Sequence, residues 1–101
     1  MVETIVKSMK VPGGKLLEIQ LDYDPNECRV VKLYITGDYF AYPPEKIDEA
    51  EKSIESRPLA LDLLDIVRDK LSYTTLYGVT VDNIVELLRE AIEEAMEKCR
   101  Q

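Results

Sequence analysis

The first third of the chain alternates apolar and polar residues with a period of two, which is the pattern of β-strands that bury one face. Three such runs follow one another. Their apolar positions, in chain order, are Ile5, Met9 and Val11, then Leu17, Ile19, Leu21 and Tyr23, and then Val31, Leu33 and Ile35. Because each run is apolar on one side alone, we expect a three-stranded antiparallel sheet that is covered on one face.

Short turn sequences separate these runs. Pro12-Gly13-Gly14 lies between the first two, and glycine accepts the positive φ that a tight hairpin requires. Gly13-Gly14-Lys15 also suggests a phosphate-binding loop. Such a loop, however, has two glycines separated by four residues and leads from a strand into a helix, whereas another strand follows here. We therefore predict a simple hairpin turn.

The rest of the chain has the apolar spacing of helices. Pro43-Pro44 suits a first helical turn because proline lacks an N–H group that would be unpaired there. A second helix is predicted from Leu59 to Ser72, and Tyr73–Val79 is predicted to be a connection. Thr80 is a suitable N-cap for a third helix. The apolar positions of the three predicted helices are Ile47, Ala50 and Ile54, then Ala60, Leu63, Leu64, Val67 and Leu71, and then Ile84, Leu87, Leu88, Ala91, Ala95 and Cys99.

The order of three strands followed by three helices predicts an α+β domain with the helices gathered on one face of the sheet. A length of 101 residues suits one such domain, which we assign to residues 1–101. The predicted fold is therefore a three-stranded antiparallel sheet covered on one face by about three helices.

Composition limits the functions open to this chain. Thirteen Lys and Arg stand against 20 Asp and Glu, so the net charge is −7, which suits neither nucleic acid nor an anionic membrane surface as a partner. The chain has no His, which excludes Ser-His-Asp and Cys-His catalysis within it. The first ten residues lack the apolar stretch of a secretory signal, so we expect a cytoplasmic protein.

The two cysteines, Cys28 and Cys99, lie far apart in the sequence and form no Cys-x-x-Cys motif. A structural zinc site needs more ligands than two cysteines supply, and we expect no metal site. A disulfide between them is possible, but nothing in the sequence requires it. We interpret them as two small hydrophobic residues in a reducing compartment.

The segment Thr36–Phe40 is the most informative in the chain, because it follows the third predicted strand and combines three unusual residue types. Gly37 permits backbone geometry that other residues avoid, and Asp38 is suited to accept hydrogen bonds within a turn. Tyr39 and Phe40 stand close to a third aromatic residue, Tyr42. These aromatics either close the seam between sheet and helices or are presented to a partner protein.

Several motifs resemble the C-terminal accessory domain of lipoate-protein ligases. They are the run Lys10-Val-Pro-Gly-Gly-Lys-Leu-Leu, the strand Val-Lys-Leu-Tyr-Ile, the segment Thr-Gly-Asp-Tyr-Phe-Ala-Tyr-Pro-Pro-Glu, and the helix entry Gly78-Val-Thr-Val-Asp-Asn-Ile. Together they span nearly the whole chain. Two positions depart from the family pattern: Tyr39 stands where Phe is commoner, and Ser56-Arg57-Pro58 stands where we expect a Gly.

The resemblance implies a function. In that family the domain is either fused behind the catalytic domain or is a separate small subunit, and this short chain resembles the separate form. Lipoate and ATP, with Mg, would bind in the complex with a catalytic chain. Lipoyl-AMP would form there, and the lipoyl group would pass to a lysine of a carrier domain, which this chain would serve indirectly. No cofactor is expected on this chain alone, and we do not expect it to be catalytic by itself.

The same resemblance assigns a set of motif residues to the interface with the catalytic chain. We predict that these are Gly13, Gly14, Lys15, Gly37, Asp38, Tyr39 and Phe40. Two other function classes fit the α+β pattern. A small-molecule-binding regulatory module would show a ligand-dependent shift in its melting temperature. An acidic protein-protein adaptor would bind partners other than a lipoate ligase chain.

Overall fold

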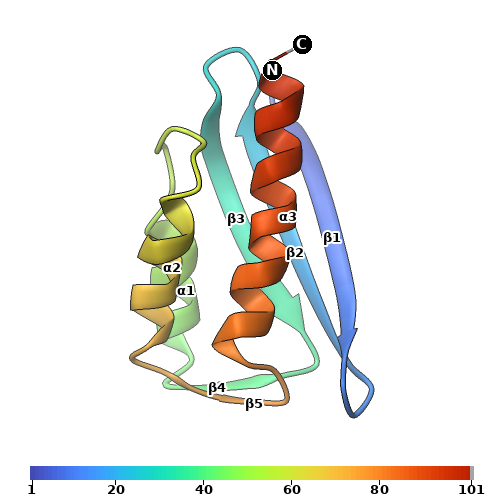
Figure 1. Cartoon of the computed structure of the whole chain (residues 1–101). Coiled ribbons are helices and arrows are strands. Elements are labelled where there is room, and N and C mark those ends of the chain that lie inside the picture. Colours follow the sequence, from blue (N-terminus) through green and yellow to red (C-terminus); the bar gives the residue numbers. More distant parts are fainter. Residues whose placement is uncertain (101) are drawn as a thin grey trace.

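The computed structural model describes residues 1–100 and has the predicted α+β architecture (Figure 1). Strands β1 (Glu3–Val11), β2 (Lys15–Asp24) and β3 (Arg29–Gly37) form an antiparallel sheet in the order β1-β2-β3. Helices α1 (Glu45–Lys52), α2 (Leu63–Leu71) and α3 (Val81–Cys99) lie on one face of it. Helix α3 packs on β1 and β2, α1 packs on β3, and α2 contacts both other helices. No helix within residues 1–100 is long and apolar enough to cross a membrane.

The core lies between the sheet and the helices, as the alternation predicted. The apolar positions of β2 are completely enclosed, and they meet the apolar side of α3. Burying an aliphatic side chain of this size stabilises a fold by about 1.5–3 kcal/mol. The fully buried residues of these two elements include Leu17, Ile19, Leu21, Ile84, Leu88 and Ile92.

One predicted core position of β3 is wrong, because this strand contains a β-bulge. Asp22 pairs with Lys32, but the next residue of β2, Tyr23, pairs with Val30, so Val31 has no partner across the sheet. An unpaired residue reverses the alternation of side chains beyond it. Val30 is therefore buried, and Val31, which we expected in the core, is 36% exposed.

The second helix begins at Leu63 rather than at Leu59, because the preceding residues are bonded to the sheet. The Leu59 amide donates to the Cys28 carbonyl oxygen at 2.8 Å, and the Val30 amide donates to the Arg57 carbonyl oxygen at 2.9 Å. These long-range bonds hold the backbone outside helical geometry. The third helix begins as predicted: Thr80 and Asn83 form a reciprocal capping box, with bonds of 3.0 and 2.9 Å.

Two short strands were not predicted. Strands β4 (Phe40–Tyr42) and β5 (Thr75–Tyr77) form a separate antiparallel ribbon below the helices in Figure 1. We had assigned β5 to a connection. A strand of three residues is too short to show a period, and its partner lies more than 30 positions away, so pattern analysis has no signal to detect.

Candidate interaction surface

All seven predicted motif residues lie together at one end of the molecule. They line an open hollow of about 530 Å³, together with Tyr77 and Gly78. The sheet register brings them together, because Leu17 near the start of β2 pairs with Gly37 at the end of β3. Whether these residues contact a partner stays a prediction. The predicted interface set did not include Tyr77 or Gly78, although Gly78 opens the helix-entry motif. The pairing of β5 with β4 brings both residues here.

Gly37 is the residue that lets the chain leave the sheet. Its φ is +149°, and a Cβ atom at this position would overlap the carbonyl oxygen of Leu16. The following amide, that of Asp38, donates a 2.8 Å hydrogen bond to the same oxygen. A side chain here would therefore separate the turn from β2.

Tyr39 supports this turn from the inside. Its side chain is half-buried against the core, and its hydroxyl donates a 2.7 Å hydrogen bond to the Ile35 carbonyl oxygen. Burial, together with the negative charges of Glu51 and Asp48, raises the pKa of Tyr39 to about 12. The hydroxyl therefore remains a donor at neutral pH. These contacts give Tyr39 a structural role, whichever partner the surface binds.

The ribbon of β4 and β5 presents aromatic side chains outward. Phe40 pairs with Tyr77, and Phe40 and Tyr42 point the same way because they are two positions apart in one strand. Phe40 is 79% exposed, Tyr42 73% and Tyr77 61%. The alternate residues, Ala41 and Leu76, pack on the core. We call Phe40, Tyr42 and Tyr77 the aromatic face. Grouped exposed aromatics of this kind are typical of protein interfaces.

An acidic hollow adjoins the aromatic face. It has a volume of about 530 Å³, and Tyr39, Phe40, Asp48 and Glu51 are among its lining residues. Glu51 accepts a 2.8 Å hydrogen bond from the Ile35 amide at the outer edge of β3. Burial is the main cause that raises the pKa of this carboxyl. The surface around Phe40 thus combines aromatic rings with carboxylates, which suits a partner surface that carries apolar and basic residues.

The Gly13–Lys15 segment is a hairpin turn, as predicted. It joins two antiparallel strands, with the Gly14 amide donating to the Val11 carbonyl oxygen at 3.0 Å. A phosphate-binding loop instead places its amides at the N-terminus of a helix. Within residues 1–100 no three Cys, Asp or Glu side chains are grouped to hold a metal ion.

The fold and this surface together define a small α+β domain with an outward aromatic ribbon. No family model matches the chain, and no curated protein does. Among solved structures, it is similar to a chain from an archaeal lipoylation system of Thermoplasma acidophilum, a bi-partite lipoate protein ligase and its E2 lipoyl domain. The TM-score is 0.71 at 26% sequence identity, and the match covers 87% of this chain and 97% of the other. The two chains are thus of comparable length and share one fold. The predicted resemblance to a lipoate-protein ligase domain that occurs as a separate small chain is confirmed.

Proposed function

We propose that this chain is the accessory, non-catalytic subunit of a two-chain lipoate-protein ligase. The observation that carries the proposal is the match over nearly the full length of a chain from a bi-partite lipoate ligase system. The sequence motifs of the accessory domain also support it, and the seven residues selected from them line one hollow. In this role the chain is required for ATP-dependent activation of lipoate to lipoyl-AMP, which precedes transfer to a carrier lysine.

The aromatic face and the adjoining hollows are the proposed docking surface for the catalytic chain. Phe40 and Tyr77 form a cross-strand pair on a ribbon whose inner side is anchored in the core by Leu76. Because the pair is held on a paired ribbon, docking orders few additional side chains and loses little conformational entropy. Burying large aromatic side chains is a major source of binding energy at interfaces.

The proposed contribution to the reaction is to order the catalytic chain. Formation of lipoyl-AMP requires the lipoate carboxylate and the ATP triphosphate to be held in line, with Mg supplying charge neutralisation when bound. We place ATP, Mg and lipoate on the catalytic chain. Docking of this subunit would order the loops around them and exclude water. Transfer from preformed lipoyl-AMP starts with an activated acyl group and should depend on this ordering less.

The two half-reactions provide the test. Activation is measured as pyrophosphate release from lipoate and MgATP, and transfer as modification of the carrier lysine by synthetic lipoyl-AMP. We expect the catalytic chain alone to transfer the lipoyl group but to need this subunit for activation. If the catalytic chain forms lipoyl-AMP equally fast alone, the accessory role is wrong.

Point variants test the docking surface separately. Phe40→Ala should weaken binding to the catalytic chain about 10–100-fold, while the melting temperature of the isolated subunit stays unchanged because Phe40 is so exposed. Val6→Ala is the matched control, since Val6 is 52% exposed on the open face of the sheet. Equal affinities for both variants would place the interface elsewhere.

We propose that the carrier domain contacts the catalytic chain rather than this subunit. The subunit carries a net charge of −7, and the resemblance implies carriers that are also acidic. Like charges across an interface oppose docking. The isolated subunit should therefore show no measurable binding to the apo carrier in titration calorimetry at physiological salt, and a clear complex would contradict this assignment.

A further inference from the structure

The fold brings the two cysteines together, although they are 71 positions apart in the sequence. Cys28 lies in the turn between β2 and β3, and Cys99 is the last residue of α3. Both thiols are free and half-buried, and both line one small hollow of about 220 Å³. Burial, and after it the adjacent Cys28 thiol, raises the pKa of Cys99 to about 11. The two sulfur atoms are therefore neighbours across the ends of two elements.

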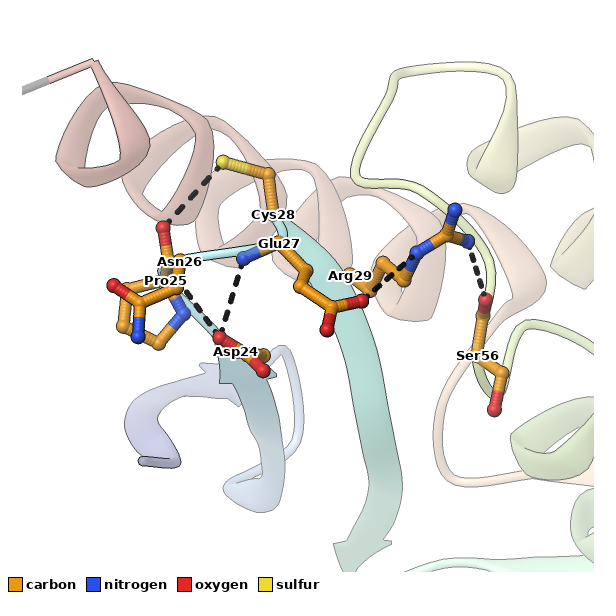
Figure 2. A network of polar contacts seen from close by, with 7 residues as sticks. All are labelled: Asp24, Pro25, Asn26, Glu27, Cys28, Arg29 and Ser56. Atoms are coloured by element: carbon orange, nitrogen blue, oxygen red, sulfur yellow. Dashed lines mark hydrogen bonds and ion pairs between the residues drawn. The ribbon is translucent and has the colours of Figure 1, made fainter.

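The backbone at Cys28 is unusual for this residue type. Its φ is +53°, in the left-handed region that glycine and asparagine favour. The Asp24 carboxylate shapes the turn, since it accepts hydrogen bonds from the amides of Asn26 at 2.8 Å and Glu27 at 3.2 Å. In Figure 2 the Cys28 side chain points away from Asp24 and toward the last turns of α3.

The turn is also held from the opposite side. The Cys28 carbonyl oxygen accepts the Leu59 amide at 2.8 Å, and the Arg29 guanidinium donates to the Ser56 carbonyl oxygen at 3.0 Å (Figure 2). The Cys28 thiol makes a long contact of 3.7 Å with the Pro25 carbonyl oxygen. Bonds on both sides thus fix the direction of the Cys28 side chain, while the thiol itself is weakly held and free to react.

We propose that Cys28 and Cys99 are a redox-responsive dithiol that forms an intramolecular disulfide, which ties the β2–β3 turn to the C-terminal end of α3. The proposal goes beyond the accessory function and does not rest on it. Our sequence analysis interpreted the two cysteines as small hydrophobic residues in a reducing compartment and left a disulfide between them possible. The structure adds that both line one hollow.

The oxidant is a low-molecular-weight disulfide of the glutathione type. The Cys28 thiolate attacks one sulfur of that disulfide, so the S–S bond breaks and one thiolate leaves. Cys99 then gives up its proton, attacks the Cys28 sulfur of the mixed disulfide and releases the second thiolate. The protein loses two electrons and two protons, and the oxidant becomes two thiols. A pKa of about 11 keeps Cys99 mostly protonated at neutral pH, so the second, intramolecular step is limited by loss of that proton, since only the thiolate attacks.

The disulfide would close most of the chain into one loop and reduce the entropy of the unfolded state. The β2–β3 turn, which contains Cys28, and the C-terminal end of α3, which ends at Cys99, lie at the end of the molecule opposite the β4–β5 ribbon (Figure 1). Oxidation should therefore stabilise the subunit and leave the aromatic face unchanged.

The experiment exposes the native full chain to oxidised glutathione and then alkylates the remaining thiols. We expect a monomer that is lighter by two hydrogens, has no thiol left to alkylate, and melts about 5–20 °C higher than the reduced protein. Dithiothreitol should reverse both changes.

Cys28→Ser and Cys99→Ser are the matched controls. Each should carry at most one glutathione and show no rise in melting temperature. Glutathione on both cysteines of the unmodified chain, disulfide-linked dimers, or an oxidised monomer that melts no higher than the reduced one would each overturn the proposal.

Discussion

The hydroxyl of Tyr39 donates a 2.7 Å hydrogen bond to the carbonyl oxygen of Ile35, four residues earlier in the chain. The bond connects Tyr39, just beyond the end of β3, to Ile35 near the end of that strand. It therefore spans the tight bend at Gly37. It also gives a physical reason for tyrosine where the family pattern favours phenylalanine, because only tyrosine has the hydroxyl. Tyr39 thereby links the exposed motif to the stability of the sheet.

We expect Tyr39→Phe to lower the free energy of unfolding by about 1 kcal/mol, since one hydrogen bond is lost and the ring remains. Urea denaturation of the isolated subunit measures this value. Binding to the catalytic chain should stay the same. A variant that unfolds like the original but binds more weakly would show that the hydroxyl belongs to the interface.

Gly37→Ala should destabilise the protein by about 3–5 kcal/mol, because a Cβ overlaps the Leu16 carbonyl oxygen and φ is positive. Gly13→Ala is the control. It has a φ of +100° but open space around it, so it should lose about 1–2 kcal/mol. Equal losses in urea denaturation would mean that φ alone, and not the contact with Leu16, makes glycine necessary.

Ser56→Gly should stabilise the protein by about 0.5–1 kcal/mol. Ser56 has a φ of +64°, which glycine adopts without strain, and this is where the family resemblance led us to expect a glycine. Its backbone bonds to Val30 and Arg29 are unaffected by the change. Ser72→Gly is the control, because Ser72 ends α2 with right-handed backbone geometry. This variant should have a lower melting temperature than the original protein. A lower melting temperature in Ser56→Gly would contradict the conclusion that the positive φ strains the backbone at Ser56.

Glu51 should make the protein less stable as the pH rises. Burial raises its pKa in the folded state, so between the ordinary Glu pKa and the raised value the folded protein holds more protons than the unfolded chain. The stabilisation that Glu51 contributes is complete below the ordinary Glu pKa. It is lost as the pH rises through the raised pKa of the folded state. Glu51→Gln should therefore match the original near pH 4 and exceed it at pH 7.

Urea denaturation at both pH values tests this prediction, with Glu93→Gln as the control for the loss of one negative charge from an exposed site. Glu51→Gln keeps an oxygen that is able to accept the Ile35 amide. If the stability advantage of Glu51→Gln shrinks as the pH rises, the hydrogen bond from the Ile35 amide affects the pKa of Glu51 more strongly than burial does.

Local patterns in the sequence determined the sheet, the three helices and the side of each that is buried. The burial of Leu17, Leu21 and Leu88 could be predicted, because a period of two or 3.6 is visible in the local sequence and needs no information about distant residues. The motif residues around Gly37 were also identifiable, because glycine, aspartate and grouped aromatics are unusual at a strand end.

Tertiary contacts alone decided the rest. The bulge that exposes Val31 depends on how β3 pairs with β2, and the late start of α2 depends on the bond from Leu59 to the turn at Cys28. The pairing of Phe40 with Tyr77 and the meeting of Cys28 with Cys99 join residues that are far apart along the chain. Such pairings depend on how the whole chain packs, and no local period encodes them.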